Sequence, residues 1–168
     1  PVGDSRRSGW TELVPHREDV MLEDVDVFAD HYVVQEREDG LARLRVTGLR
    51  DQTSHHVQFP EPTYAVWPEP NAEFVTTRYR FRYQSMITPS SVYEYDMVSR
   101  ERVLLKSSEV LGGYDPSRYR SERVHARAAD GTRIPISLVF RADAQRDADK
   151  HAHGHADAAA RDVEVQRL

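Results

Sequence analysis

The apolar residues of this chain recur at every second position in short runs, and Asp, Gly and Pro residues separate the runs. The clearest run is 76–83, where three aromatic side chains fall on one face and three arginines on the other. A period of two is that of a β-strand with one buried face. The aromatic residues are Tyr79, Phe81 and Tyr83, and the arginines are Arg78, Arg80 and Arg82. We expect the aromatic face to pack against a neighbouring sheet.

The same period predicts several more strands. Two short strands lie within 26–36, on either side of a turn at Ala29-Asp30, and others are predicted in 41–46, 57–59, 64–67, 91–96 and 102–106. The dipeptide Asp39-Gly40 predicts a hairpin, because glycine accepts the positive φ that a tight turn needs. No window of helical length before residue 141 has apolar residues at three- and four-residue spacing. Strands that recur every eight to twelve residues, roughly, are typical of an all-β sandwich, barrel or propeller.

A change of composition at 110–116 marks a candidate domain boundary. Beyond it, 121–128 and 133–140 predict one more hairpin with Gly131 at its turn. Pro135 has no amide hydrogen to donate, so its strand is expected at a sheet edge or with a bulge.

The last part of the chain, 142–168, is dominated by Ala, Asp, Arg and His. It has too few large apolar residues to offset the entropy of ordering, so we expect disorder, with a frayed helix at 157–165 as the second interpretation. Its composition also fits out-of-frame translation of a GC-rich gene, a hypothesis that resequencing tests. The chain begins at Pro1 without an initiator Met. We therefore expect an internal piece of a longer protein.

Composition adds several exclusions. The 168 residues are 39% hydrophobic and 30% charged, which permits one domain with a core. The formal net charge of −5 argues against nucleic acid as the main partner, since phosphate binding requires clustered Lys and Arg. The absence of cysteine excludes disulfides, thiolate metal sites and cysteine nucleophiles. No stretch approaches ~18 consecutive apolar residues, so no membrane-spanning helix is expected.

Three segments are specific in combination: Ser-Met-Ile-Thr-Pro at 85–89, Gly-Gly-Tyr-Asp-Pro at 112–116 and Ile-Pro-Ile-Ser-Leu-Val at 134–139. Further segments in the same order are 10–13, 15–17, 30–37, 40–41, 59–62, 91–97, 119–123 and 130–133. Together they resemble the prolyl oligopeptidase family and, within it, the oligopeptidase B subgroup. The resemblance covers 10–141 and ends where the tail begins.

The resemblance implies an all-β fold: the last blades of a seven-bladed β-propeller with antiparallel four-stranded blades, followed by the first β-hairpin of an α/β-hydrolase domain. On that basis, we expect the propeller in 1–110, the interdomain crossing in 111–120, the start of the catalytic domain in 121–141 and a disordered tail in 142–168. The family consists of cytoplasmic serine peptidases whose propeller admits only short peptides to the active site. The subgroup cleaves short basic peptides after Arg or Lys and needs no cofactor.

A serine peptidase of this fold needs a nucleophile in a Gly-x-Ser-x-Gly elbow. Ser5 comes nearest, but Arg7 stands where the second glycine would be. In the family the catalytic Ser, Asp and His all lie beyond the end of the resemblance. We therefore assign no catalytic residue, expect no metal or cofactor, and expect the chain alone to be inactive, because loss of a triad costs on the order of 10⁶ in rate.

Histidine clusters allow two interpretations. The alternating His151, His153 and His155 either bind a divalent metal or belong to a solvated tail, which is favoured because the tail offers no fixed geometry. The pair His55-His56 is interpreted as structural or facing solvent. The pair His16-Arg17 either faces the propeller channel or lies in a strand-end loop, and the loop is favoured.

Two clusters of charged residues also allow two interpretations each. The arginines of 76–83 either bind an anion or form the polar face of a strand, which is favoured. An acidic cluster either attracts basic peptides or forms a solvated loop, which is again favoured. The cluster consists of Glu18, Asp19, Glu23, Asp24 and Asp26. For the whole chain, the alternative to part of a peptidase is a non-enzymatic β-repeat interaction module.

Overall fold

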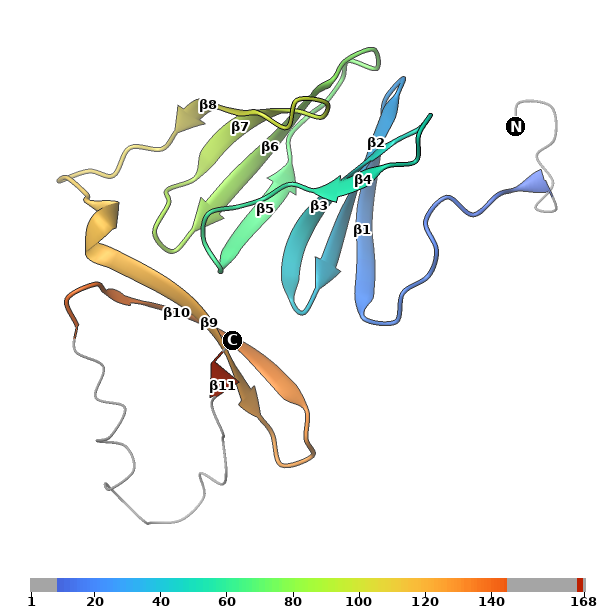
Figure 1. Cartoon of the computed structure of the whole chain (residues 1–168). Helices are drawn as coiled ribbons and strands as arrows, with labels where there is room; N and C mark the ends of the chain where they lie inside the picture. Colours follow the sequence, from blue (N-terminus) through green and yellow to red (C-terminus); the bar gives the residue numbers. More distant parts are fainter. Residues whose placement is uncertain (1–8, 145–165, 168) are drawn as a thin grey trace.

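The computed structural model describes residues 9–144 and 166–167. Within them the chain forms two four-stranded antiparallel sheets and a smaller third sheet, with no α-helix (Figure 1). The first sheet has the order β1 (Val20–Val27), β2 (His31–Glu38), β3 (Leu41–Gly48) and β4 (Ser54–His56). The second has the order β5 (Tyr64–Pro68), β6 (Arg78–Ser85), β7 (Ser91–Asp96) and β8 (Arg102–Ser107). The expected all-β class with antiparallel four-stranded sheets is confirmed.

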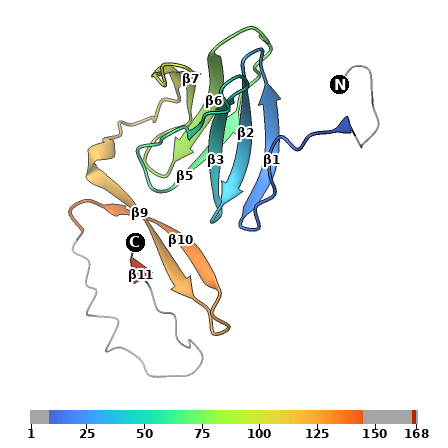
Figure 2. The same cartoon turned by 45° about the vertical axis from the view of Figure 1, so that its right-hand side comes forward.

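The third sheet follows a short 3₁₀ turn, Pro116–Arg118. Its strands are β10 (Arg133–Arg141), β9 (Tyr119–Arg127) and β11 (Gln166–Arg167), with β9 in the middle. Pro135 therefore lies on an edge strand, as its missing amide hydrogen predicts. Both views show this sheet apart from the stack of the other two (Figures 1 and 2).

Two residues of the tail pair with the third sheet in strand β11. Gln166 pairs with His125 and Arg167 with Val124, whereas disorder remains the prediction for the tail as a whole. The free edge of β9 offers backbone partners to any extended segment, and composition does not show this. Residues 145–165, which include the second interpretation of a frayed helix, lie outside the described residues.

The core lies between the faces of the first two sheets. Leu44 of the first sheet and Phe81 of the second are fully buried there, and Tyr79 and Tyr83 are each 1% exposed. The Phe28 and Tyr79 rings meet edge to face with centroids 6.0 Å apart. The expected packing of the aromatic face of β6 against a neighbouring sheet is thus confirmed.

Two local expectations were wrong. The acidic cluster was expected to be a loop, but Glu23, Asp24 and Asp26 lie in β1. Pairing with β2 on both sides of an irregularity at Glu23 keeps this polar sequence extended. The strand expected at 57–59 instead occupies Ser54–His56, because its register with β3 is set by backbone pairing rather than by the apolar run.

The outer strands of the two sheets leave apolar side chains exposed. Val25 and Val27 of β1 are about half exposed, and so are Val103 and Leu105 of β8. Burial of such surface stabilises a fold by roughly 25 cal/mol per Å². These strands therefore offer apolar surface for contact with further structure.

Candidate functional site at the junction of the sheets

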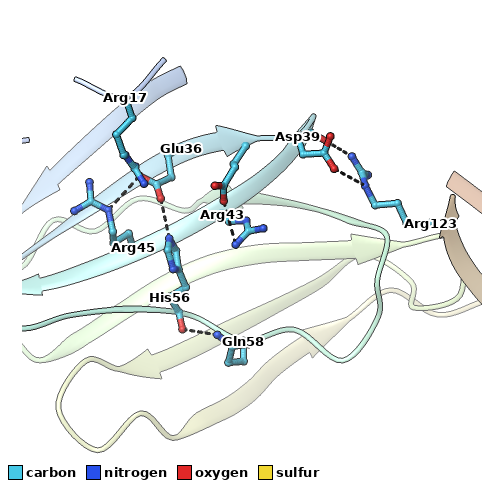
Figure 3. A network of polar contacts seen from close by, with 9 residues as sticks. Arg17, Glu36, Asp39, Arg43, Arg45, His56, Gln58 and Arg123 are labelled. Carbon is cyan, nitrogen blue, oxygen red and sulfur yellow. Dashed lines mark hydrogen bonds and ion pairs between the residues drawn. The ribbon is translucent and has the colours of Figure 1, made fainter. Parts of the chain in front are cut away.

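The hairpin turn between β2 and β3 contacts the third sheet. Asp39 and Gly40 both have positive φ, +50° and +72°, so the two-residue turn is of the kind that the Asp-Gly pair predicts. Nε2 of His125 lies 2.9 Å from Oδ2 of Asp39, and Arg123 donates to the Asp39 carbonyl oxygen. Figure 3 shows Asp39 and Arg123 pointing toward each other. His125 is only 3% exposed, so the turn supplies a charged partner to a buried side chain.

The backbone conformation of the turn favours glycine at position 40. A Cβ at this position would lie 3.5 Å from both a guanidinium nitrogen of Arg123 and Cγ of Pro135, which is ordinary contact. Its positive φ, rather than lack of space, is what favours glycine here. Turn geometry therefore fixes where the Asp39 carboxylate meets the third sheet.

A second contact lies on the crossing segment that precedes the third sheet. The Tyr114 hydroxyl donates to the carbonyl oxygen of Ile87 at 2.5 Å. Asp115 accepts from the amide and the hydroxyl of Ser117, at 3.0 and 2.6 Å, and so begins the 3₁₀ turn. The Tyr114 ring stacks on Tyr119 with centroids 5.7 Å apart. We call the Asp39 and Tyr114 contacts together the junction.

The Ile87 turn is itself held by a carboxylate from a distant segment. Glu61 accepts hydrogen bonds from the hydroxyls of Tyr83, Ser85 and Thr88. The Ser85 and Thr88 bonds measure 2.9 and 2.5 Å. The segments 59–62, 85–89 and 112–116, which carried the family resemblance, therefore meet at one place. The sequence of these segments does not by itself predict that they contact one another.

A buried carboxylate lies in the first sheet, near the junction (Figure 3). Glu36 is fully buried and accepts from Nε2 of His56 at 2.7 Å, from Nε of Arg45 at 3.1 Å and from Arg17. Burial opposes ionisation, but the hydrogen bonds of His56 and Arg45 and the charges of Arg45 and Arg17 outweigh it and lower the pKa of Glu36. The cluster is therefore an ion network that joins β2, β3 and β4 to the segment before β1.

This network explains two of the histidine and arginine pairs chosen from the sequence. His56 and Arg17 bind Glu36, and His55 Nε2 lies 2.9 Å from the Tyr95 hydroxyl. His16 is exposed. These contacts agree with the structural interpretation of His55-His56. His151, His153 and His155 lie outside the described residues.

The arginine row of β6 is paired within its own sheet. Arg78 and Arg80 donate to Glu94 at 2.9 and 3.0 Å, and Arg82 donates to Glu69 at 2.7 Å. These pairs support the interpretation of the row as the polar face of a strand.

In the acidic cluster, Asp26 accepts from the Tyr79 hydroxyl at 3.0 Å, and burial raises the pKa of Asp26.

The described residues hold no arrangement for nucleophilic catalysis. The rings of His55, His56 and His125 contact Tyr95, Glu36 and Asp39, and no hydrogen bond between a serine hydroxyl and a histidine is found within 9–144. In the same part of the chain, no group of three or more His, Asp or Glu residues has the geometry to hold a metal ion. Nor does any helix there have the length and apolar character to cross a membrane.

Comparisons with known proteins agree with this fold. The family model described as the prolyl oligopeptidase N-terminal beta-propeller domain matches residues 1–108. Dipeptidyl aminopeptidase BI of Pseudoxanthomonas mexicana is 40% identical over 148 residues, which cover 88% of this chain and 20% of that protein.

Two solved structures are similar as well. Oligopeptidase B from Trypanosoma brucei with covalently bound antipain is 34% identical, with a TM-score of 0.68, over 79% of this chain and 20% of that one. Oligopeptidase B from Leishmania major is 31% identical, with a TM-score of 0.69, over 81% of this chain and 20% of that one. The chain thus spans about a fifth of the length of these relatives. It belongs to the prolyl oligopeptidase family, and residues 1–108 are part of that family's N-terminal β-propeller domain.

Proposed function

We propose that the protein to which this chain belongs is a serine peptidase that hydrolyses short peptides after Arg or Lys. The observation that carries the proposal is the family match over 1–108, together with 34% identity to an oligopeptidase B. In this proposal the chain supplies the last blades of a seven-bladed propeller, which limit access to the active site. The catalytic residues come from another part of the protein, and its location is the cytoplasm.

The junction gives the chain a role beyond that of a passive cover. In our proposal 121–141 begins the hydrolase domain, 111–120 is the crossing, and 1–110 is propeller. The Asp39–His125 contact then joins the two domains, and the Tyr114–Ile87 contact ties the crossing to the propeller. Movement of the propeller relative to the catalytic domain would have to bend or break these contacts, so they would affect how readily substrate enters.

A second candidate function rests on the 40% identity to dipeptidyl aminopeptidase BI. An enzyme of that name removes dipeptides from a free amino terminus, whereas an oligopeptidase cleaves within short peptides. The two functions therefore differ in whether a blocked amino terminus prevents cleavage.

The test uses the protein encoded by the full reading frame that contains this sequence. An N-acylated chromogenic peptide with Arg before the scissile bond is compared with its Ala counterpart and with an unblocked Ala-Arg substrate. Preferential cleavage of the blocked Arg peptide supports the first proposal. Cleavage of the unblocked substrate alone supports the second, and cleavage of none of the three overturns both.

The 168-residue chain is tested in parallel with the same substrates. We expect no hydrolysis above background. Turnover that survives purification and disappears with a serine-directed inhibitor would show that the chain itself carries catalytic residues.

A further inference from the structure

A cleft of about 310 Å³ lies between the first two sheets, at the β7–β8 turn. Its walls come from β4 and the residues after it on one side, and from β7 and the start of β8 on the other. The lining residues are His55, His56, Val57, Gln58, Tyr95, Arg100 and Arg102. Two arginines and two histidines thus line one cleft, and within the described residues no carboxylate does.

Arg100 occupies this wall in an unusual backbone conformation. Its φ is +64°, in the left-handed region where glycine is favoured and a long side chain carries a steric cost. The turn that imposes this φ is closed by Asp96, whose carboxylate accepts from the amides of Val98 and Ser99. Because glycine would suit the position better, the presence of arginine points to a use for its side chain.

Arg102 is fixed at the opposite end of the same turn. It donates to the Gln58 carbonyl oxygen at 3.1 Å. Its guanidinium also lies 5.0 Å from the ring centroid of Tyr93 and 6.0 Å from that of Phe59. These contacts hold the planar group in place and leave some of its N–H donors for another acceptor.

His55 lines the cleft together with the two arginines. Its Nε2 contacts the hydroxyl of Tyr95, which is a buried residue. Burial lowers the pKa of His55, and Arg100, His31 and His56 nearby lower it further. The fixed positive charge of the cleft therefore comes from Arg100 and Arg102, and the His55 ring adds a hydrogen-bonding group beside them.

The neighbouring carboxylates do not neutralise this charge from within the cleft. Glu36 binds His56 from outside the lining. Asp96 is occupied by turn amides and by the Thr77 hydroxyl, which donates to it at 2.7 Å. Guanidinium groups with free donors bind phosphate and carboxylate groups by paired hydrogen bonds. We propose that this cleft binds a compact oxyanion, a phosphate or a carboxylate group, through Arg100, Arg102 and His55.

The proposal does not depend on the peptidase function. It is tested by calorimetric titration of the 168-residue chain at constant ionic strength with three probes. These are inorganic phosphate, N-acetyl-dialanine with a free carboxylate, and the same peptide as its amide. We expect saturable binding of phosphate or of the free carboxylate, and none of the amide. Binding of phosphate but not of the free carboxylate identifies a phosphate site. Binding of the free carboxylate but not of phosphate identifies a site for the carboxyl terminus of a peptide.

The variant Arg100→Gly separates binding from folding. Glycine suits the positive φ, so the melting temperature should hold or rise, while anion affinity falls roughly tenfold or more. The matched control is Arg50→Gly, because Arg50 is exposed, lies outside the cleft and has the same charge. Bound anion should also raise the pKa of His55 in an NMR titration, since it offsets the nearby cations. Absence of saturable anion binding, or equal weakening by both variants, overturns the proposal.

Discussion

His125 and Asp39 are 86 positions apart in the chain, yet Nε2 of the imidazole lies 2.9 Å from Oδ2 of the carboxylate. The imidazole is buried, whereas the carboxylate is 47% exposed at the tip of a turn. The pair therefore joins the third sheet to the first through one side chain that water reaches and one that it does not.

Asp39→Asn should loosen the third sheet without disturbing the turn. Asparagine tolerates the left-handed backbone at this position, but it cannot provide the charge that faces His125. Weakening a charged hydrogen bond to a buried group costs about 1–2 kcal/mol, or roughly tenfold in local opening. Amide hydrogen exchange across β9 and β10 should speed up accordingly. The control is Asp19→Asn, an exposed site, and equal protection in both variants would contradict the prediction.

Glu36→Gln should reduce the free energy of unfolding by about 2–4 kcal/mol, because it removes the only carboxylate between Arg17, Arg45 and His56 in the described network. The matched control is Glu69→Gln, which breaks a half-exposed pair with Arg82 and should cost at most about 1 kcal/mol. Urea titration of both variants measures the difference. Similar losses of unfolding free energy in the two variants would mean that the buried Glu36 network stabilises the fold no more than an exposed ion pair does.

Acid should destabilise the fold partly through Glu36. Its pKa in the folded chain lies below the ordinary value of 4.5, so its ionised form stabilises the fold fully above that pH. The contribution is lost as the pH falls through the lower folded value. Unfolding free energies measured across this range should therefore converge for the parent chain and Glu36→Gln. A constant difference between the two down to strongly acid pH would show that the carboxylate's charge is not what stabilises the sheet.

The strand pattern of the sequence predicted much of the fold because one face of each strand is buried. The strand 91–96 was placed to the residue, and the aromatic face of β6 was placed correctly. The errors occurred where pairing, not side-chain pattern, keeps the chain extended. Strand β1 carries acidic residues on both faces, so its sequence alone resembles that of a loop. Pairing with β2 is what makes it a strand.

The junction could not be predicted in the same way. Asp39-Gly40 indicates a hairpin turn, but nothing in that dipeptide says that a histidine 86 positions later will contact it. The contacts of Glu61 could not be predicted either, because a carboxylate between two prolines has the sequence pattern of a solvated loop residue. Contacts between distant loops depend on how the sheets are arranged, and period-two patterns carry no information about that arrangement.

The Glu61 cluster yields a last prediction, on the coupling between Glu61 and Tyr83. Glu61→Ala removes the acceptor shared by three hydroxyls and should cost about 1–3 kcal/mol of unfolding free energy. Tyr83→Phe removes one of those hydroxyls, so the double variant should lose less than the sum of the two single losses. A double-mutant cycle in urea should give a coupling of about 1 kcal/mol or more. Strict additivity would show that the Tyr83 hydroxyl does not stabilise the fold through Glu61.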